Sequence, residues 1–327
     1  MTMAQETIRL LAVAIALVGS VCIGAAAKGE PTARTFPLLH VDCRGAPGPA
    51  PTVILQAGAF GTSADWDLVL DDLAQGGRVC AFDRAGLGAS PERPGEKDVL
   101  TKAGELNSLL DQLGETRPVI LVGHSNGALY DEAFAALWPG RVAGLVSVNG
   151  VGADDLADPR LLTDLAKERR AARLAVTAGR LGLARIVAKV LTDQMPLGET
   201  ATNAKRDSLM SLARLKVGCD EDRAILPGLE ATRRLGPVSA DIPVAVIVSM
   251  SRPPTPIEEA WRRAEIAPAL RSHRGWILDM PGATHVSPLI RDRAYVRAAV
   301  DWLRTPYQTP TLGIEVQGSA GAREPSF

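Results

Sequence analysis

Short apolar runs recur along the 327-residue chain, separated by polar stretches that contain glycine and proline. Runs of this kind, rich in valine, isoleucine and leucine, are typical of strands buried on both faces of a sheet. They predict strands at residues 38–42, 51–56, 78–82, 119–122, 142–148, 242–248 and 275–280. Helical periodicity between them predicts helices at residues 64–73, 99–113, 128–137, 257–267 and 291–303. This alternation predicts an α/β fold with a mainly parallel sheet, whose ligands lie at the carboxyl ends of the strands.

The alternation stops between residues 152 and 237, where only helical patterns occur. We expect a helical insertion there, dividing the core into residues 28–151 and 238–304. Beyond the core, residues 305–327 are rich in proline, glycine, threonine and serine, which predicts a disordered tail.

The first 27 residues differ in character from the rest of the chain. A continuous apolar run at residues 10–23 follows Arg9 and leads into three alanines before Lys28. This order is typical of a secretory signal peptide cut after Ala27. The run as far as Ala27 also has the length of an uncleaved membrane anchor. Both alternatives predict export to the periplasm or the cell exterior, and the second adds attachment to the membrane.

Composition narrows the class of partner. The chain carries 36 Lys and Arg against 37 Asp and Glu, so no basic excess favours nucleic acid. Aromatic residues make up 4 %, too few to suggest a platform for stacking bases. Neither a dinucleotide fingerprint nor a metal-ligand cluster occurs in the sequence. We therefore expect an enzyme of small molecules that needs no cofactor or metal.

The most informative stretch is Gly123-His124-Ser125-Asn126-Gly127, which lies between a predicted strand and a predicted helix. In that context a G-x-S-x-G motif forms a sharp turn that lifts the serine hydroxyl above the sheet edge. Gly123 and Gly127 lack the Cβ atoms that would collide where strand and helix pass. The amide of Asn126 begins the helix, where unpaired N–H groups favour an anion. The turn predicts Ser125 as a nucleophile with half an oxyanion hole beside it.

With the segments around it, this motif resembles the α/β-hydrolase superfamily of serine esterases, lipases, lactonases and peptidases over residues 38–303. The resemblance is carried by Gln56-Ala57-Gly58-Ala59, Trp66, residues 78–88, the serine motif and Gly282-x-x-His285. Within the superfamily the chain looks like exported or membrane-anchored bacterial hydrolases. That likeness implies a mainly parallel eight-stranded sheet flanked by helices, with a helical cap between strands six and seven. It also implies that Cys43 lies near Cys80, either as a disulfide or as two buried thiols.

The resemblance implies that Ser125 is the nucleophile and that His285, after the last strand, is its general base. The other three histidines do not have this placement. Relatives place a carboxylate after the seventh or the sixth strand, but here Asn149 follows the sixth. We expect Asn149 to orient His285 through its side-chain carbonyl. The alternatives are Asp154, which is second, and Asp155 and Glu258.

The backbone amides of Ala59 and Asn126 are the expected oxyanion donors, and Phe60 and Trp66 are expected to shape the substrate pocket. Together these residues predict a serine hydrolase of the carboxylesterase or lipase kind, acting on an ester-like bond of a small molecule. Two alternatives remain open. One is a non-catalytic binding protein that has lost its acid, and the other is an acyltransferase or haloperoxidase-like variant.

Overall fold

The computed structural model describes residues 38–305. The expected signal or anchor at residues 1–27 and the expected tail, apart from Thr305, lie outside the described residues. Between residues 38 and 305, no helix combines the length and the apolar character needed to cross a membrane.

The core is a seven-stranded sheet in the order β1-β3-β2-β4-β5-β6-β7. The strands are β1 (Val41–Arg44), β2 (Val53–Gln56), β3 (Val79–Phe82), β4 (Val119–His124), β5 (Val142–Val148), β6 (Val244–Met250) and β7 (Gly275–Pro281). β1 runs antiparallel to β3, and all other neighbours are parallel. The mainly parallel α/β sheet is thus confirmed. The sheet has seven strands rather than the expected eight within the described residues, because no strand precedes β1 there.

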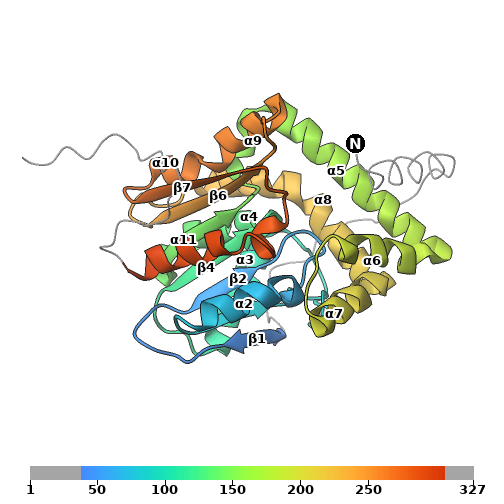
Figure 1. Ribbon diagram of the computed structural model, residues 1–327, viewed down its shortest axis with the longest axis horizontal. Coiled ribbons are helices and arrows are strands. Elements are labelled where there is room, and N and C mark those ends of the chain that lie inside the picture. Colours follow the sequence, from blue (N-terminus) through green and yellow to red (C-terminus); the bar gives the residue numbers. More distant parts are fainter. Residues whose placement is uncertain (1–37, 306–327) are drawn as a thin grey trace, which may run out of the picture.

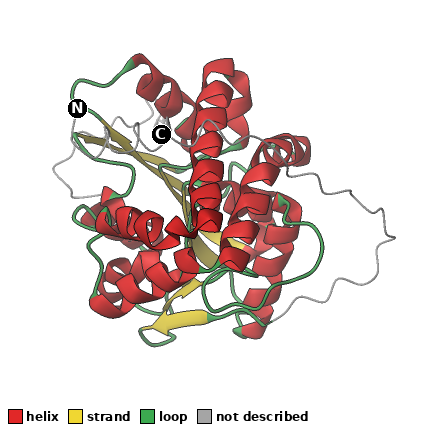
Figure 2. Ribbon diagram, turned by 90° about the vertical axis from the view of Figure 1, so that its right-hand side faces the viewer, coloured by secondary structure: helices red, strands yellow, loops and turns green. Residues whose placement is uncertain are grey.

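Helices cover both faces of the sheet (Figure 1, Figure 2). They are α2 (Asp67–Ala74), α3 (Val99–Gln112), α4 (Asn126–Leu137), α9 (Pro256–Glu265), α10 (Ala267–Arg271) and α11 (Ala294–Arg304), with short helical turns η1 (Ser63–Trp66), η2 (Pro139–Arg141) and η5 (Ser287–Leu289). Successive side chains of β4 enter different cores. Leu121 packs in the core that includes α3 and α4, and Val122 in the core that includes α2 and α11. Because both faces are covered, the inner strands are predominantly apolar instead of alternating.

The insertion between β5 and β6 is built from helices alone, as its periodicity predicts. It comprises η3 (Ala153–Ala157), α5 (Pro159–Ala178), η4 (Gly179–Leu183), α6 (Ala184–Asp193), α7 (Glu199–Met210) and α8 (Leu212–Leu235). Figure 1 shows α5, α6 and α7 gathered at one end of the molecule. Ion pairs tie the insertion to the loops after β2 and β3, between Lys205 and Asp65 and between Glu221 and Arg84. The insertion is therefore fastened to the carboxyl-end loops of the sheet.

Cys43 of β1 and Cys80 of β3 form a disulfide. The two residues are directly opposite each other in the antiparallel register of these strands. The sequence left open whether they are a disulfide or two buried thiols, and the structure gives the disulfide. It links the edge strand β1 covalently to the sheet.

Candidate active site

Ser125 occupies the turn between β4 and α4, with φ 54° and ψ −124°. A positive φ is unfavourable for a residue with a Cβ and indicates a strained turn. The flanking glycines are needed because the chain passes itself closely there. A Cβ on Gly127 would lie 2.3 Å from the carbonyl oxygen of Gln56, and one on Gly123 would lie 2.5 Å from the amide nitrogen of Ala128. The turn therefore has the conformation that the G-x-S-x-G motif predicts.

Three residues other than glycine have a positive φ between residues 38 and 305, namely Phe60 (55°), Ser125 (54°) and Asn149 (46°). They follow β2, β4 and β5, which are neighbours in the sheet. All three therefore lie at one edge of the sheet, at the carboxyl ends of adjacent parallel strands. Strained backbone of this kind clusters at functional sites.

His285 lies in the loop after β7, and two side chains hold its backbone carbonyl. The Nδ2 of Asn149 donates to this oxygen at 2.9 Å, and the Nε2 of His124 does so at 3.0 Å. The rings of His124 and His285 also lie 4.7 Å apart between centroids. Because a carbonyl only accepts, this bond places the proton of neutral His124 on Nε2. The structure thus brings together the loops after β4, β5 and β7, with His285 beside the residue that precedes Ser125.

Both imidazoles at this site are neutral near pH 7. Desolvation lowers the pKa of His124 well below its ordinary 6.5, and the nearby His285 lowers it further. Desolvation also lowers the pKa of His285, to about 4. His285 is nevertheless exposed to solvent, so water offsets part of this lowering. A neutral imidazole is the form that a general base requires.

Asn149 makes contacts other than those expected from the sequence. Its Oδ1 accepts from the amide of Ser249 at 2.7 Å, and its Nδ2 donates to Ser249 Oγ at 3.0 Å as well as to the His285 carbonyl. The side-chain carbonyl is therefore engaged with β6 and makes no hydrogen bond with the imidazole of His285. Asn149 positions the loop of His285 through the backbone.

The carboxylates considered as alternatives are also engaged elsewhere. Asp154 accepts two hydrogen bonds of 2.8 Å from Arg271. Asp155 accepts from the amide of Gly152, which directly precedes η3, and Glu258 caps α9. Burial acts to raise the pKa of Glu258, but hydrogen bonds from two hydroxyls and two amides lower it to about 2. Among residues 38–305, no carboxylate bonds the ring of His285, and no hydrogen bond joins that ring to Ser125.

The loop after β2 passes alongside Ser125. A Cβ on Gly58 would lie 2.9 Å from the Cβ of Ser125. The guanidinium of Arg84 donates to the carbonyl oxygen of Ala57, and at 2.9 Å to that of Gly58. In a trans peptide the C=O and N–H point in opposite directions, so this bond turns the amide of Ala59 away from Arg84. Ala59 is exposed, and its amide makes no hydrogen bond within the described chain.

Arg84, which sequence reasoning did not single out, is itself held by a buried group of charges. Its Nη2 lies 2.9 Å from Glu221 of α8, and the same carboxylate lies 3.0 Å from Lys102 of α3. The side chains of these three residues are at most 2 % exposed. Burial acts to lower the pKa of Arg84, but the charge of Glu221, its hydrogen bond and the charges of other neighbours together outweigh burial and raise the pKa. The insertion therefore supplies the anion that keeps Arg84 against the loop of Ala59.

The two expected pocket residues have different surroundings. Trp66 is 0 % exposed and belongs to the core between the sheet and α2, so it does not line a pocket open to substrate. The expectation for Trp66 was wrong because its helix faces the sheet. Its ring instead meets His124 edge-on, at 6.4 Å between centroids. Phe60 is partly exposed and packs against the insertion, where Gly218 has no side chain.

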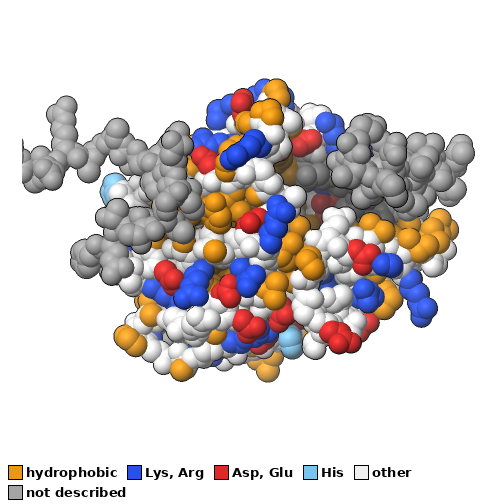
Figure 3. Space-filling model, in the orientation of Figure 1, with side chains coloured by type: hydrophobic (Ala, Val, Ile, Leu, Met, Phe, Trp, Pro, Cys, Tyr) orange, Lys and Arg blue, Asp and Glu red, His pale blue; other side chains and the backbone are white. Residues whose placement is uncertain are grey.

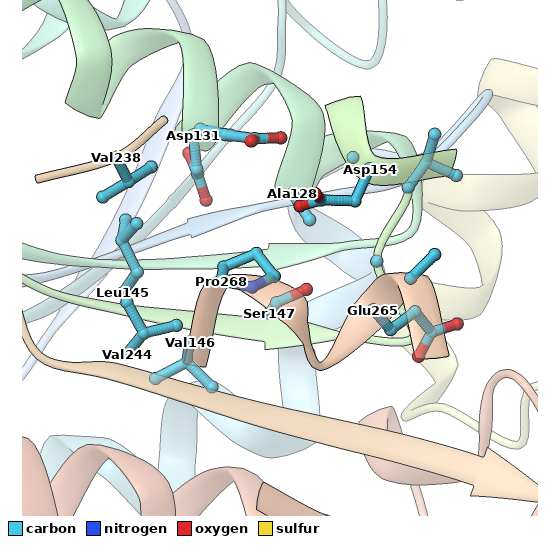
Figure 4. A pocket seen from close by; sticks show the side chains of 15 residues that line it. Ala128, Asp131, Leu145, Val146, Ser147, Asp154, Val238, Val244, Glu265 and Pro268 are labelled. Atoms are coloured by element: carbon cyan, nitrogen blue, oxygen red, sulfur yellow. The ribbon is translucent and has the colours of Figure 1, made fainter. Parts of the chain in front are cut away.

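A cavity of about 40 Å³ lies away from Ser125, between α4, β5, β6 and α10 (Figure 4). Ala128, Asp131, Ser147 and Glu265 are among its lining residues, whereas Ser125 and His285 are not. Burial raises the pKa of Asp131 and of Glu265 well above the ordinary range. No group of histidine, cysteine and carboxylate side chains in the described residues is arranged to hold a metal ion.

A family model described as alpha/beta hydrolase fold matches residues 51–262. The chain belongs to the α/β hydrolase family. One relative of the chain is RutD of Stutzerimonas stutzeri strain A1501, which is assigned as a carbamate hydrolase. The two sequences are 35 % identical over 113 residues. This match covers 34 % of the chain and 42 % of the relative. RutD of Escherichia coli O139:H28 is 36 % identical over 102 residues, or 31 % of the chain and 38 % of the relative. The chain thus matches less than half of the length of these relatives.

Solved structures show the same α/β hydrolase fold. An esterase from Thermogutta terrifontis superposes with a TM-score of 0.59 at 22 % identity, covering 83 % of this chain and 94 % of the esterase. An enol-lactonase from Burkholderia xenovorans LB400 superposes with a TM-score of 0.56 at 20 % identity, covering 81 % of this chain and 96 % of the lactonase. At these identities the likeness concerns the fold alone.

Proposed function

We propose that the protein is a serine hydrolase that cleaves an ester-like bond of a small molecule through an acyl-enzyme. The observation that carries this proposal is the convergence of the strained residues Phe60, Ser125 and Asn149 at one sheet edge, with His285 bound to Asn149. A hydrolase needs a nucleophile, a base and an anion site at one point, and these loops supply candidates for each.

The reaction begins when Ser125 Oγ attacks the carbonyl carbon of the substrate and its proton passes to His285. The amides of Ala59 and Asn126 stabilise the oxyanion, since both are backbone donors beside the serine. His285 then protonates the leaving alcohol as the carbonyl re-forms. Water then attacks the acyl-enzyme and gives its proton to His285, which returns it to Ser125 Oγ as the bond to the acyl group breaks and the acid is released.

Positioning of the base is the unusual part of this proposal. In a serine triad a carboxylate orients the imidazole and stabilises its cation. Here Asn149 and His124 fix the backbone of His285, and the ring has no carboxylate partner in the described residues. His285 is therefore a comparatively weak base that captures the serine proton less readily, so attack depends more on how electrophilic the substrate carbonyl is. We expect esters with good leaving groups to be the better substrates.

Turnover of a panel of esters tests the proposal, with carbamates included because of the RutD relatives. We expect hydrolysis of aryl and enol esters that Ser125→Ala and His285→Gln each abolish. Turnover that survives in Ser125→Ala contradicts a serine mechanism. A folded wild-type protein that hydrolyses none of the panel favours the non-catalytic binding protein.

A further inference from the structure

Exposed apolar side chains are concentrated on the helical insertion. Of the 11 large apolar side chains that are exposed in the described residues, six lie between residues 181 and 212. We call these six the α6 patch: Leu181, Leu183, Ile186, Val190, Leu191 and Leu212, with exposures between 37 % and 61 %. Figure 3 shows apolar side chains gathered at the end of the molecule where Figure 1 places α6.

Three members of the patch share one helix face. η4 runs directly into α6, and Leu183, Ile186 and Val190 follow the spacing of one helix face. Leu212, at the start of α8, lies near the first residue of η4, because its Cδ2 is 3.8 Å from the position of a Cβ on Gly179. Contiguous exposed apolar surface of this kind marks an interaction site more often than scattered single residues do.

The patch is separate from the packing that holds the insertion together. Other positions of α6, namely Val187, Ala188 and Thr192, are at most 8 % exposed. Ala188 joins the core of the insertion, with Leu209 and others. The apolar side of α6 is therefore only partly covered by the described residues.

Positive charge accompanies the patch. Residues 180–192 contain Arg180, Arg185 and Lys189 and no acidic residue, although the whole chain is close to neutral. Arg185 and Lys189 are exposed, and Lys189 pairs with Asp193 at the end of the helix, at 2.6 Å. An apolar helix face with basic residues beside it suits a bilayer that contains anionic lipids.

The length of the chain before residue 38 makes such a surface reachable. The apolar run at residues 10–23, a predicted signal or anchor, is followed by 14 residues before Leu38. Fourteen residues span at most about 50 Å when extended. A run held in a bilayer would therefore keep the described domain within reach of that membrane.

We propose that the α6 patch docks on the surface of a bilayer that contains anionic lipids. α6 lies along the interface, its apolar face enters the acyl boundary, and Arg185 and Lys189 meet the lipid head groups. This proposal does not depend on the hydrolase activity, because the patch contains none of the candidate catalytic residues.

Site-specific photocrosslinking of the full chain tests the docking. A benzophenone amino acid replaces Val190 in one sample and Leu270 in another, since Leu270 is a 58 % exposed leucine on α10, outside the patch. Each protein is mixed with vesicles of phosphatidylcholine, with or without about 30 % phosphatidylglycerol, and irradiated. We expect lipid adducts at position 190, several-fold more abundant with phosphatidylglycerol, and few at position 270. Arg185→Glu/Lys189→Glu is expected to reduce the adducts at position 190 by a similar factor.

Three results would overturn the proposal. The first is equal lipid labelling at positions 190 and 270, which would reflect attachment through another part of the chain. The second is an adduct between position 190 and a peptide, from the first 37 residues or from a second copy of the chain. The third is an absence of lipid adducts at position 190 with both kinds of vesicle, whether or not the chain carries Arg185→Glu/Lys189→Glu.

Discussion

Replacing Glu221 with glutamine should destabilise the protein strongly, because two buried cations share this carboxylate. Arg84 and Lys102 lie 2.9 and 3.0 Å from it, and all three side chains are almost wholly buried. Burial acts to raise the pKa of Glu221, but the two cations lower it, so the carboxylate is charged. Removing one partner of a buried ion pair costs about 3–5 kcal/mol, since the remaining charge stays desolvated.

A loss of this size should be visible in thermal melting. For a domain of this length, each kcal/mol lowers Tm by about 2–4 °C, so Glu221→Gln should melt roughly 10 °C below wild type. Glu230→Gln is the matched control, because Glu230 lies on the same helix but pairs with Arg233 and Arg234 at the surface. We expect the control to melt like wild type.

The same variant should slow catalysis below its melting temperature. Without the charge of Glu221, the guanidinium of Arg84 loses its carboxylate partner and is held only by the carbonyls of the loop, so the carbonyl of Gly58 is restrained less firmly. We expect a lower kcat with little change in KM, since the oxyanion donors act mainly in the transition state. If Glu221→Gln melts and turns over like Glu230→Gln, the reasoning about the buried charges is refuted.

Three further predictions concern the base and the buried carboxyls. Asn149→Asp should lower kcat about 10- to 100-fold, because a carboxylate oxygen would replace the donor that faces the His285 carbonyl. Steady-state kinetics decide this, and turnover equal to or above wild type would favour contact with the ring instead. Because the pKa of His285 is lowered, kcat/KM should stay constant from about pH 8 to 6.5 and fall only in more acid solution. A pH–rate profile with an apparent pKa of about 7 or above would contradict this. Burial raises the pKa of Glu132 to about 7 and of Asp155 to about 8, so above about pH 6.5, where the histidines are neutral in both states, these two carboxyls make the folded protein bind more protons than the unfolded chain up to about pH 8. Stability therefore falls as pH rises through that window, and Tm should be lower at about pH 8.5 than at 6.5; an unchanged or higher Tm would count against it.

The sequence was sufficient for the strands and for the serine turn, because both depend on local patterns. Continuous apolar runs locate six of the seven strands, and the glycines around Ser125 specify a turn in which Cβ atoms would collide. The expected strand at residues 38–42 overlaps β1 (Val41–Arg44) by only two residues, because β1 is not an apolar run. The cysteine pair follows from strand order, which the resemblance supplied. The expected eighth strand came from the resemblance alone, without an apolar run to support it.

Contacts between distant residues were beyond the reach of sequence reasoning. Arg84 and Glu221 are 137 positions apart, and no local pattern links them. The side chain of a strand-end asparagine such as Asn149 can turn either its NH2 group or its carbonyl oxygen toward a given neighbour. Which of the two faces His285 depends on Ser249, which is 100 positions away. For Trp66, the aromatic ring was compatible with a pocket or a core, and only the packing of its helix decides between them.

Labelling with a fluorophosphonate probe tests most directly whether Ser125 is an activated nucleophile. The probe forms a covalent bond with a serine only when a base and an oxyanion site assist it. We predict about one label per folded chain, at Ser125 by peptide mapping, and none in Ser125→Ala. Folded wild-type protein that takes up no label, or a Ser125→Ala variant that is labelled equally, would contradict the proposed mechanism.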